Sequence, residues 1–343
     1  MKTKLPLFAV LLIATLATLF AQGPLTPPGA PAPTMKTLAQ IEARTPISSA
    51  PFTISQSGSY YLTANVTVSS GTAITITASN VTLDLNGFTI SSTDASTTGY
   101  GILLDNGPRN ITITNGFIQG SVTNNGGFYS GSGFLYGIST SGGVPTNVLV
   151  SRVSISGCQS FGIVLFTGDS TVVEFCTVRT VGGDGINASI IKSCSAVDCG
   201  SNAIFGRQVS DCLGQSSNFG NGVFARAAMN CQGQSVSGPG VSARVAMNCQ
   251  GESVSGVGLF AQVATNCVGI SNSGSGLWAS KIATSCFGET SSAGTVGLFS
   301  DAAANYCSGS NQGGGPAMQA DNAIGCTTFN GAIIAGQKFL GTP

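Results

Sequence analysis

A repeated unit occupies the second half of this chain and constrains its fold more than any other feature. The repeat runs from Arg207 to Phe339, and its units are 18 to 21 residues long when they are aligned on a cysteine. Self-similarity at a short, fixed period is typical of a solenoid, in which each unit packs only on its neighbours. The aligned cysteines are Cys212, Cys231, Cys249, Cys267, Cys286, Cys307 and Cys326, and the ladder continues upstream at Cys194, Cys176 and Cys158.

The composition of the units predicts strands and not helices. Each unit is dense in glycine, serine, asparagine and short apolar residues, and the signatures of leucine-rich, ankyrin and tetratricopeptide repeats are absent. A coil of about 18 extended residues has a perimeter of about 60 Å, which suits a narrow prism with two or three short strands per coil. Successive coils of such a parallel β-helix stack at about 4.8 Å, so equivalent residues form columns along the axis.

The first 21 residues have the pattern of a secretory signal peptide. Lys2 and Lys4 form a charged start, an apolar run follows, and Ala21 is a small cleavage residue. The run is short for a spanning helix, which needs about 20 residues; an uncleaved anchor is the alternative. We therefore expect a secreted, periplasmic or cell-surface protein with no membrane span after signal removal.

The remaining chain keeps 11 basic against 13 acidic residues once Lys2 and Lys4 are removed, a formal charge of −2. This balance gives no basic field for nucleic acid, so none is expected as a partner. Thr37 and Gln40 form a capping box, which predicts a short helix at residues 38–44 that covers the end of the solenoid, unless this helix is simply part of the tail. The predicted organisation is a signal peptide (1–21), a proline-rich leader (22–35), a cap with irregular coils (36–150) and regular coils with the cysteine ladder (151–343).

Four segments carry a resemblance to a known superfamily. The runs GSYYL from Gly58, NVTLDLNGFTI from Asn80, NITITNGFI from Asn110 and GGDGI from Gly182 are similar to those of exported right-handed parallel β-helix proteins of the pectin-lyase-like superfamily. The resemblance covers roughly residues 36–340 and implies the right-handed sense of the coil. It is specific for fold and weak for activity, because such coils serve lyases, hydrolases, adhesins and proteins without known activity.

An enzymatic function would follow the superfamily as a polysaccharide lyase or glycoside hydrolase. The chain has no histidine, which excludes every histidine-dependent mechanism. On the repeat, Asp184, Asp198 and Asp211 fall in different columns. Glu252 and Glu289 share a column but lie two coils apart, about 10 Å at 4.8 Å per coil. We therefore predict no catalytic residue, metal site or cofactor, although a site built across the glycine-rich residues 121–147 remains an alternative.

Ten of the eleven cysteines fall in one column, and the eleventh is Cys199. An exported protein invites a disulfide interpretation. Neighbouring coils, however, hold equivalent Cβ atoms about 4.8 Å apart, whereas a disulfide requires about 3.8 Å. We expect inward-facing thiols that pack as small hydrophobes, with bridged pairs as the alternative.

Strand alternation then assigns the other columns of the repeat. If each long strand alternates regularly, the interior holds the cysteines together with apolar columns that include Val245, Met229 and Met247, and an alanine column containing Ala228 and Ala246 is exposed. An asparagine column before the cysteines is also exposed, with left-handed corners and stacked amides as its structural explanation. The remaining exposed columns are candidate ligand-binding rows, one aromatic (Phe205, Phe224, Phe260, Trp278) and one basic (Arg207, Arg226, Arg244, Lys281).

The candidate rows suit an extended anionic ligand. Arginine forks match carboxylate and sulfate groups, and aromatic faces can cover sugar rings. The sequence thus favours a non-catalytic scaffold that binds an acidic polysaccharide or a cell-envelope glycan. The alternative is that the basic row is merely solvated, and a corner near Ser280 would place the two rows on different faces.

Overall fold

The computed structural model describes residues 42–166, 168 and 170–339. The chain divides between Ala43 and Arg44, and the solenoid belongs to the second unit, Arg44–Pro343. The signal peptide and leader expected at residues 1–35 lie outside the described residues, as does most of the helix expected at 38–44. The described residues are all-β, and none of them forms a helix long and apolar enough to cross a membrane.

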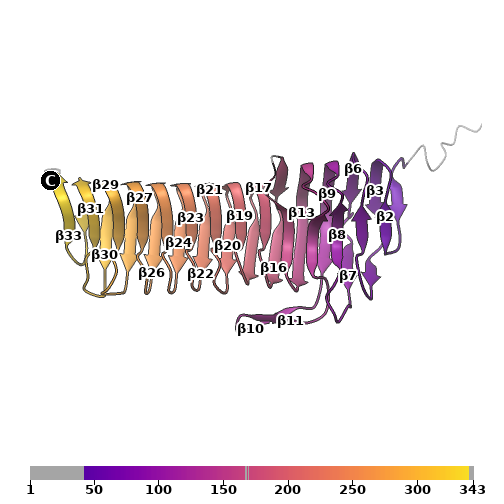
Figure 1. Ribbon diagram of the computed structural model, residues 1–343, viewed down its shortest axis with the longest axis horizontal. Helices are drawn as coiled ribbons and strands as arrows, with labels where there is room; N and C mark the ends of the chain where they lie inside the picture. Colours follow the sequence, from indigo (N-terminus) through magenta and orange to yellow (C-terminus); the bar gives the residue numbers. More distant parts are fainter. Residues whose placement is uncertain (1–41, 167, 169, 340–343) are drawn as a thin grey trace, which may run out of the picture. The chain divides into compact units, whose positions relative to one another are not determined.

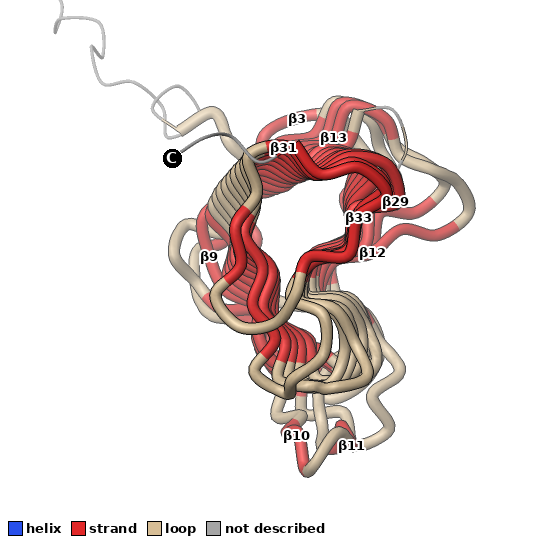
Figure 2. Tube along the Cα trace, turned by 90° about the vertical axis from the view of Figure 1, so that its left-hand side faces the viewer, coloured by secondary structure: helices blue, strands red, loops and turns tan. Residues whose placement is uncertain are grey.

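The second unit is a parallel β-solenoid of about 15 turns, which confirms the predicted fold class. Figure 1 shows the coils side by side from β2 and β3 at one end to β33 at the other. The right-handed sense stays an expectation of the resemblance. Looking along the axis, Figure 2 shows the strands of successive coils in superposed layers around an enclosed interior. Three ladders of parallel strands run the length of the solenoid.

The first ladder pairs one strand of each coil with its equivalent in the next, as in Ile186↔Ile204 and Ile204↔Val223. It begins with short strands and continues through the first halves of longer ones. Its members are β2 (Phe52–Ile54), β5 (Ile74–Ile76), β8 (Tyr100–Asp105), β12 (Tyr136–Ser141), β14 (Phe161–Phe166), β17 (Ile186–Lys192), β19 (Ile204–Ser210), β21 (Val223–Met229), β23 (Val241–Met247), β25 (Leu259–Thr265), β27 (Leu277–Thr284), β29 (Leu298–Asn305), β31 (Met318–Ile324) and β33 (Ile333–Phe339).

The second ladder starts separately and then merges with the long strands, so that the odd-numbered strands from β17 to β33 contribute their second halves to it. The third ladder closes each coil after the cysteine. The second begins with β1 (Thr45–Ile47), β3 (Gly58–Leu62), β6 (Val81–Asp84), β9 (Arg109–Gln119), β13 (Thr146–Cys158) and β15 (Thr171–Glu174). The third contains β4 (Val66–Val68), β7 (Thr89–Ser92), the ends of β9 and β13, β16 (Thr177–Val181), β18 (Ser195–Cys199), β20 (Leu213–Ser216), β22 (Gln232–Ser235), β24 (Gln250–Ser253), β26 (Val268–Ser271), β28 (Phe287–Thr290), β30 (Ser308–Asn311) and β32 (Thr327–Thr328).

A bend in each long strand overturns part of the predicted inside-outside pattern. In β21, Arg226 and Ala227 are both exposed, and the parallel register skips the arginine before it resumes. Two successive outward residues shift the alternation by one position. Consequently the alanine column (Val209, Ala228, Ala246, Ala264, Ala283) is buried and not exposed. Val245, Met229 and Met247, which were expected inside, are 44%, 48% and 43% exposed.

The cysteine column faces inward from Cys176 to Cys326, as predicted, and all eleven cysteines are buried free thiols. Cys158 was wrongly assigned to this column, because its coil advances by more than 18 residues (Ser154↔Thr177); it pairs with Val181 and so shares a column with Cys199. The preceding residue has a left-handed backbone, with φ of 52° at Asn230 and 53° at Asn248. The thiol of Cys231 donates a hydrogen bond to the carbonyl oxygen of Met229 at 3.2 Å, and Cys249 repeats this contact with Met247. Asn248 Nδ2 donates to Asn230 Oδ1 at 3.1 Å. The structural explanation of the asparagine column, a left-handed corner with stacked amides, is therefore confirmed.

A buried hydroxyl column, which the sequence analysis did not identify, fastens the loops between the third and first ladders. Ser253 Oγ donates to the carbonyl oxygen of Gly238 at 2.8 Å and accepts the Gly256 N–H at 2.8 Å. Ser235 and Ser271 make the same pair of contacts in the adjacent coils. Each hydroxyl thus satisfies two backbone groups that lie away from water.

Candidate functional site

The predicted aromatic row forms one column on the outward face of the first ladder. The parallel register joins Phe205, Phe224, Ser242, Phe260 and Trp278 in successive coils. A register shift in β27 absorbs the extra residue near Ser280, so Trp278 stays in line. The next member is Phe299, which the sequence analysis missed although it occupies the same place in its repeat.

The rings of this aromatic column pack along the axis in two groups, with Ser242 between them. Phe205 and Phe224 are stacked, with centroids 5.1 Å apart and an interplanar angle of 9°. Trp278 lies edge-to-face between Phe260 and Phe299, at centroid distances of 5.6 and 5.5 Å. Phe224 and Trp278 are each 38% exposed. The column is therefore a half-exposed aromatic ridge, stabilised by its own ring contacts and still open to a ligand.

The predicted basic row is also one column, and it lies where the long strands bend. Arg207, Arg226, Arg244 and Lys281 are all exposed. The column changes sign beyond Lys281, a reversal that was not predicted from the sequence. Asp301 and Asp321, both exposed, occupy the bend in β29 and β31, so the basic stretch ends there.

The two columns lie next to each other on one side of the solenoid. Phe224 and Arg226 are two residues apart on β21 with the buried Ala225 between them, so both side chains point outward. The bend follows the arginine and does not separate it from the ring. The corner near Ser280 is therefore a local register shift, and Lys281 remains at the bend beside the ridge. We call these eight predicted residues together with Phe299 the aromatic–basic strip.

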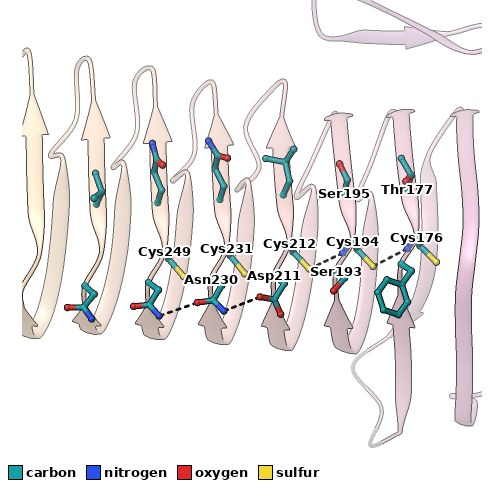
Figure 3. A pocket seen from close by; sticks show the side chains of 17 residues that line it. Cys176, Thr177, Ser193, Cys194, Ser195, Asp211, Cys212, Asn230, Cys231 and Cys249 are labelled. Atoms are coloured by element: carbon teal, nitrogen blue, oxygen red, sulfur yellow. Dashed lines mark hydrogen bonds between the residues drawn. The ribbon is translucent and has the colours of Figure 1, made fainter.

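A second surface feature is an open groove at the next corner, with a volume of about 960 Å³. Figure 3 shows its cysteine sulfurs in a row, with Asp211 and Asn230 along one edge. Asn230 donates to Asp211, and Asn248 donates to Asn230. Its floor of thiols is buried, and the amides already bond to one another. The geometry of the corner thus accounts for the groove without a ligand.

The glycine-rich region at 121–147 contains an antiparallel hairpin, formed by β10 (Thr123–Asn125) and β11 (Phe128–Ser130). Figure 1 shows it projecting beside the coils of β16 and β20. It is anchored on Asp198, which accepts hydrogen bonds from Asn124 Nδ2 at 2.6 Å and from the Tyr129 hydroxyl at 3.1 Å. These contacts hold the projecting hairpin in a defined position on the coils.

The Asp198 carboxylate is held in its ionised form by its donors. Burial opposes ionisation, but the hydrogen bonds from Asn124, Thr180, Ser217 and Tyr129 outweigh it and lower the pKa of Asp198. Burial and the neighbouring carboxylate raise the pKa of Tyr129. A carboxylate with four donors is occupied as a structural anchor, which leaves it poorly suited to proton transfer.

Acidic side chains do not gather into a metal site in the part of the chain that the structure describes. There, no group of three or more histidine, cysteine, aspartate or glutamate side chains could hold a metal ion. Asp184 lies in the loop that precedes β17, and Asp198 lies on β18 in the third ladder. Nothing in this geometry favours the lyase or hydrolase alternative over binding.

No protein-family model matches this chain, and neither does any curated protein sequence. Among solved structures, the chain is similar to the Dettilon tailspike protein, at 13% identity and a TM-score of 0.34, with 85% of this chain and 61% of that chain covered. It is also similar to the enzymatically active domain of tailspike protein 2 of bacteriophage CBA120, at 10% identity and a TM-score of 0.19, with 83% and 41% covered. The chain thus spans less than two thirds of either one, and such distant likenesses carry no argument about its function.

Proposed function

We propose that this protein is an exported, non-catalytic scaffold that binds an extended acidic polysaccharide along the aromatic–basic strip. The observation that carries the proposal is the alignment of an aromatic column beside a basic column on one outward face. Both columns follow the solenoid axis, so a linear polymer can contact several coils at once. The expectation of export rests on the charged and apolar pattern of residues 1–21.

The chemistry of the strip matches a polymer of acidic sugars. The guanidinium groups of Arg226 and Arg244 can each bind a carboxylate or sulfate through paired N–H donors. The rings beside them supply apolar surface for the C–H groups of a sugar. Because equivalent residues recur at about 4.8 Å, several weak contacts add along one chain of the ligand.

The decisive experiment compares two double variants that remove the same charge. Arg226→Ser/Arg244→Ser alters the strip, whereas Arg109→Ser/Arg179→Ser removes two exposed arginines elsewhere on the solenoid. We expect the strip variant to bind immobilised alginate or heparin about tenfold more weakly, a loss of about 1.4 kcal/mol, and the control to bind as the wild type does. Equal retention of both variants would refute the proposal.

Two further readouts locate the ligand and test the enzymatic alternative. Trp278 is the single tryptophan of the chain, so its fluorescence reports directly on the strip. We expect its emission to change on addition of the polymer in the wild type. Release of unsaturated or reducing ends from alginate or polygalacturonate by the purified protein would replace the non-catalytic proposal with a lyase or hydrolase.

A further inference from the structure

The outward column that carries the aromatic ridge changes character on the N-terminal side of Phe205. Asn187 pairs with Phe205, and Val164 pairs with Asn187, while Ser139 occupies the equivalent place in β12. These residues are small where the ridge is large. Ser139 and Val164 are only 4% and 5% exposed although they face outward. The strip therefore leads into a depression, and neighbouring groups cover the side chains that form its floor.

A wall of three aromatic rings borders this depression. Tyr100 and Tyr136 are stacked with centroids 5.0 Å apart, and Tyr136 and Phe161 follow at 5.4 Å, with interplanar angles of 9° and 10°. The wall and the floor enclose a cleft of about 220 Å³. Drug-sized ligands occupy pockets of about 300–1,000 Å³, so this cleft is of a size for one small ring.

The polar end of the cleft holds an acceptor without a donor. Asp184 Oδ1 accepts from the backbone N–H and from Nδ2 of Asn202, at 3.0 and 3.2 Å. Asp184 Oδ2 faces Asn187 Nδ2 at 3.4 Å, which fixes the orientation of the Asn187 amide. Asn187 Oδ1 is then left buried with no hydrogen-bond partner. An unpaired buried acceptor is costly, and a ligand hydroxyl that reached it from the cleft would satisfy it.

We propose that this cleft is a subsite for one neutral hexose unit of the polysaccharide bound along the strip. The inference rests on the proposed function and narrows it to a heteropolysaccharide with neutral and acidic units. A sugar ring supplies the hydroxyl donor for Asn187 and apolar C–H groups for Val164 and the aromatic wall. The Asp184 carboxylate disfavours a uronic acid in the cleft, because two like charges repel at short range.

The test uses saturation-transfer NMR on the folded full chain with glucose, galactose and mannose as probes and glucuronate as the charged counterpart. We expect a signal from at least one neutral hexose and none from glucuronate. Asn187→Leu should weaken that signal about tenfold, because the acceptor is lost. Gln319→Leu is the matched control, since Gln319 pairs with Phe299 in the same column at the far end of the strip.

Ser139→Phe provides a second variant, which fills the cleft from its floor and leaves the Asn187–Asp184 contact in place. It should also abolish the hexose signal, and circular dichroism of each variant checks the fold. The proposal is overturned if no neutral hexose gives a signal, if Asn187→Leu and Ser139→Phe both bind as the wild type does, or if glucuronate binds equally well. The two double arginine variants separate this proposal from the proposed function. If Arg226→Ser/Arg244→Ser and the control double variant lose polymer retention equally but keep the hexose signal, the proposed function is refuted and hexose binding in the cleft still stands.

Discussion

The two halves of the solenoid fill their interiors in different ways, as one inward column of the third ladder shows. In register from coil to coil, this column reads Val66, Ile90, Ile118, Ile155, Val178 and Ala196, and then Gly214, Gly233, Gly251, Gly269, Gly288 and Gly309. The early coils are held apart by branched side chains. In the later coils the column has no side chain, so opposite walls approach each other directly.

The difference teaches how side-chain size determines what holds a coil together. The early coils bury large aliphatic groups such as Ile113 and Ile155, so the hydrophobic effect dominates there. The later coils keep one inward aliphatic column, which includes Val241 and Leu259, but otherwise bury alanine, glycine, cysteine and serine. Their thiols and several of their hydroxyls donate to backbone carbonyl groups. The uniform later coils carry the straight columns of the strip, whereas the irregular early coils form the cleft and the hairpin.

The largest effect should come from emptying the interior of an early coil. Ile155→Ala leaves a cavity between branched neighbours, and we expect a loss of about 2–5 kcal/mol in the free energy of unfolding. Urea unfolding followed by circular dichroism measures it. Ile334→Ala is the control, because Ile334 is 50% exposed. If both substitutions cost the same, the early coils do not depend on aliphatic packing as we describe.

Filling the interior of a later coil should be nearly as damaging. A Cβ atom at Gly251 would lie 2.1 Å from the carbonyl oxygen of Gly258, a backbone atom that cannot step aside. Gly251→Ala should therefore cost about 3 kcal/mol in the same urea experiment. Gly294→Ala meets nothing within 4 Å and should change stability little. A neutral Gly251→Ala would show that the later coils have room in their interior, against the comparison.

Much of this architecture could be predicted from period alone. An 18-residue spacing places Cys249 over Cys231 regardless of the details of the coil, and the strand ladders confirm it. The phase of the alternation could not be predicted in the same way, because no residue type marks the bend after Arg226. The residue types found within each column did indicate which columns face the interior. The inward alanine column keeps a small residue from Ala228 to Ala323, whereas the column of Met229 contains serine and threonine in other coils, as expected for residues that face water.

The cleft is the part of the molecule that the sequence least predicts. Its floor and wall come from β8, β12, β14 and β17, whose coils differ in length, so a fixed period does not align them. The strand register, and with it the neighbourhood of Tyr136 and Asn187, follows only from three-dimensional pairing. The aromatic–basic strip could be predicted because its coils repeat, although its reversal of charge at Asp301 was overlooked.

The hairpin offers a smaller, pH-dependent test of the early half. Because hydrogen bonds lower the pKa of Asp198 in the folded state, its carboxylate stabilises the anchor above the unfolded pKa of about 4, and this contribution is lost as the pH falls through the folded value. We expect amide exchange at Thr123–Ser130 to accelerate about tenfold at acidic pH relative to the coils. In Asp198→Asn the hairpin should exchange faster at neutral pH, with little further change on acidification. An unaltered pH response in this variant would mean that another group anchors the hairpin.

The smallest effect should appear where the two halves agree, in the amide ladders at their left-handed corners. Asn147 Nδ2 donates to Asn110 Oδ1 at 2.7 Å in the early half, as Asn248 does to Asn230 at 3.1 Å in the later half. Glycine adopts the left-handed backbone freely, so Asn147→Gly and Asn248→Gly should each cost less than about 1 kcal/mol, the net value of one exposed hydrogen bond. Asn248→Ala should cost more than Asn248→Gly, because alanine adds backbone strain to the same lost contact. Urea midpoints of the three variants decide the matter: if alanine is tolerated better than glycine, the side-chain amide and not the backbone conformation explains asparagine at these corners.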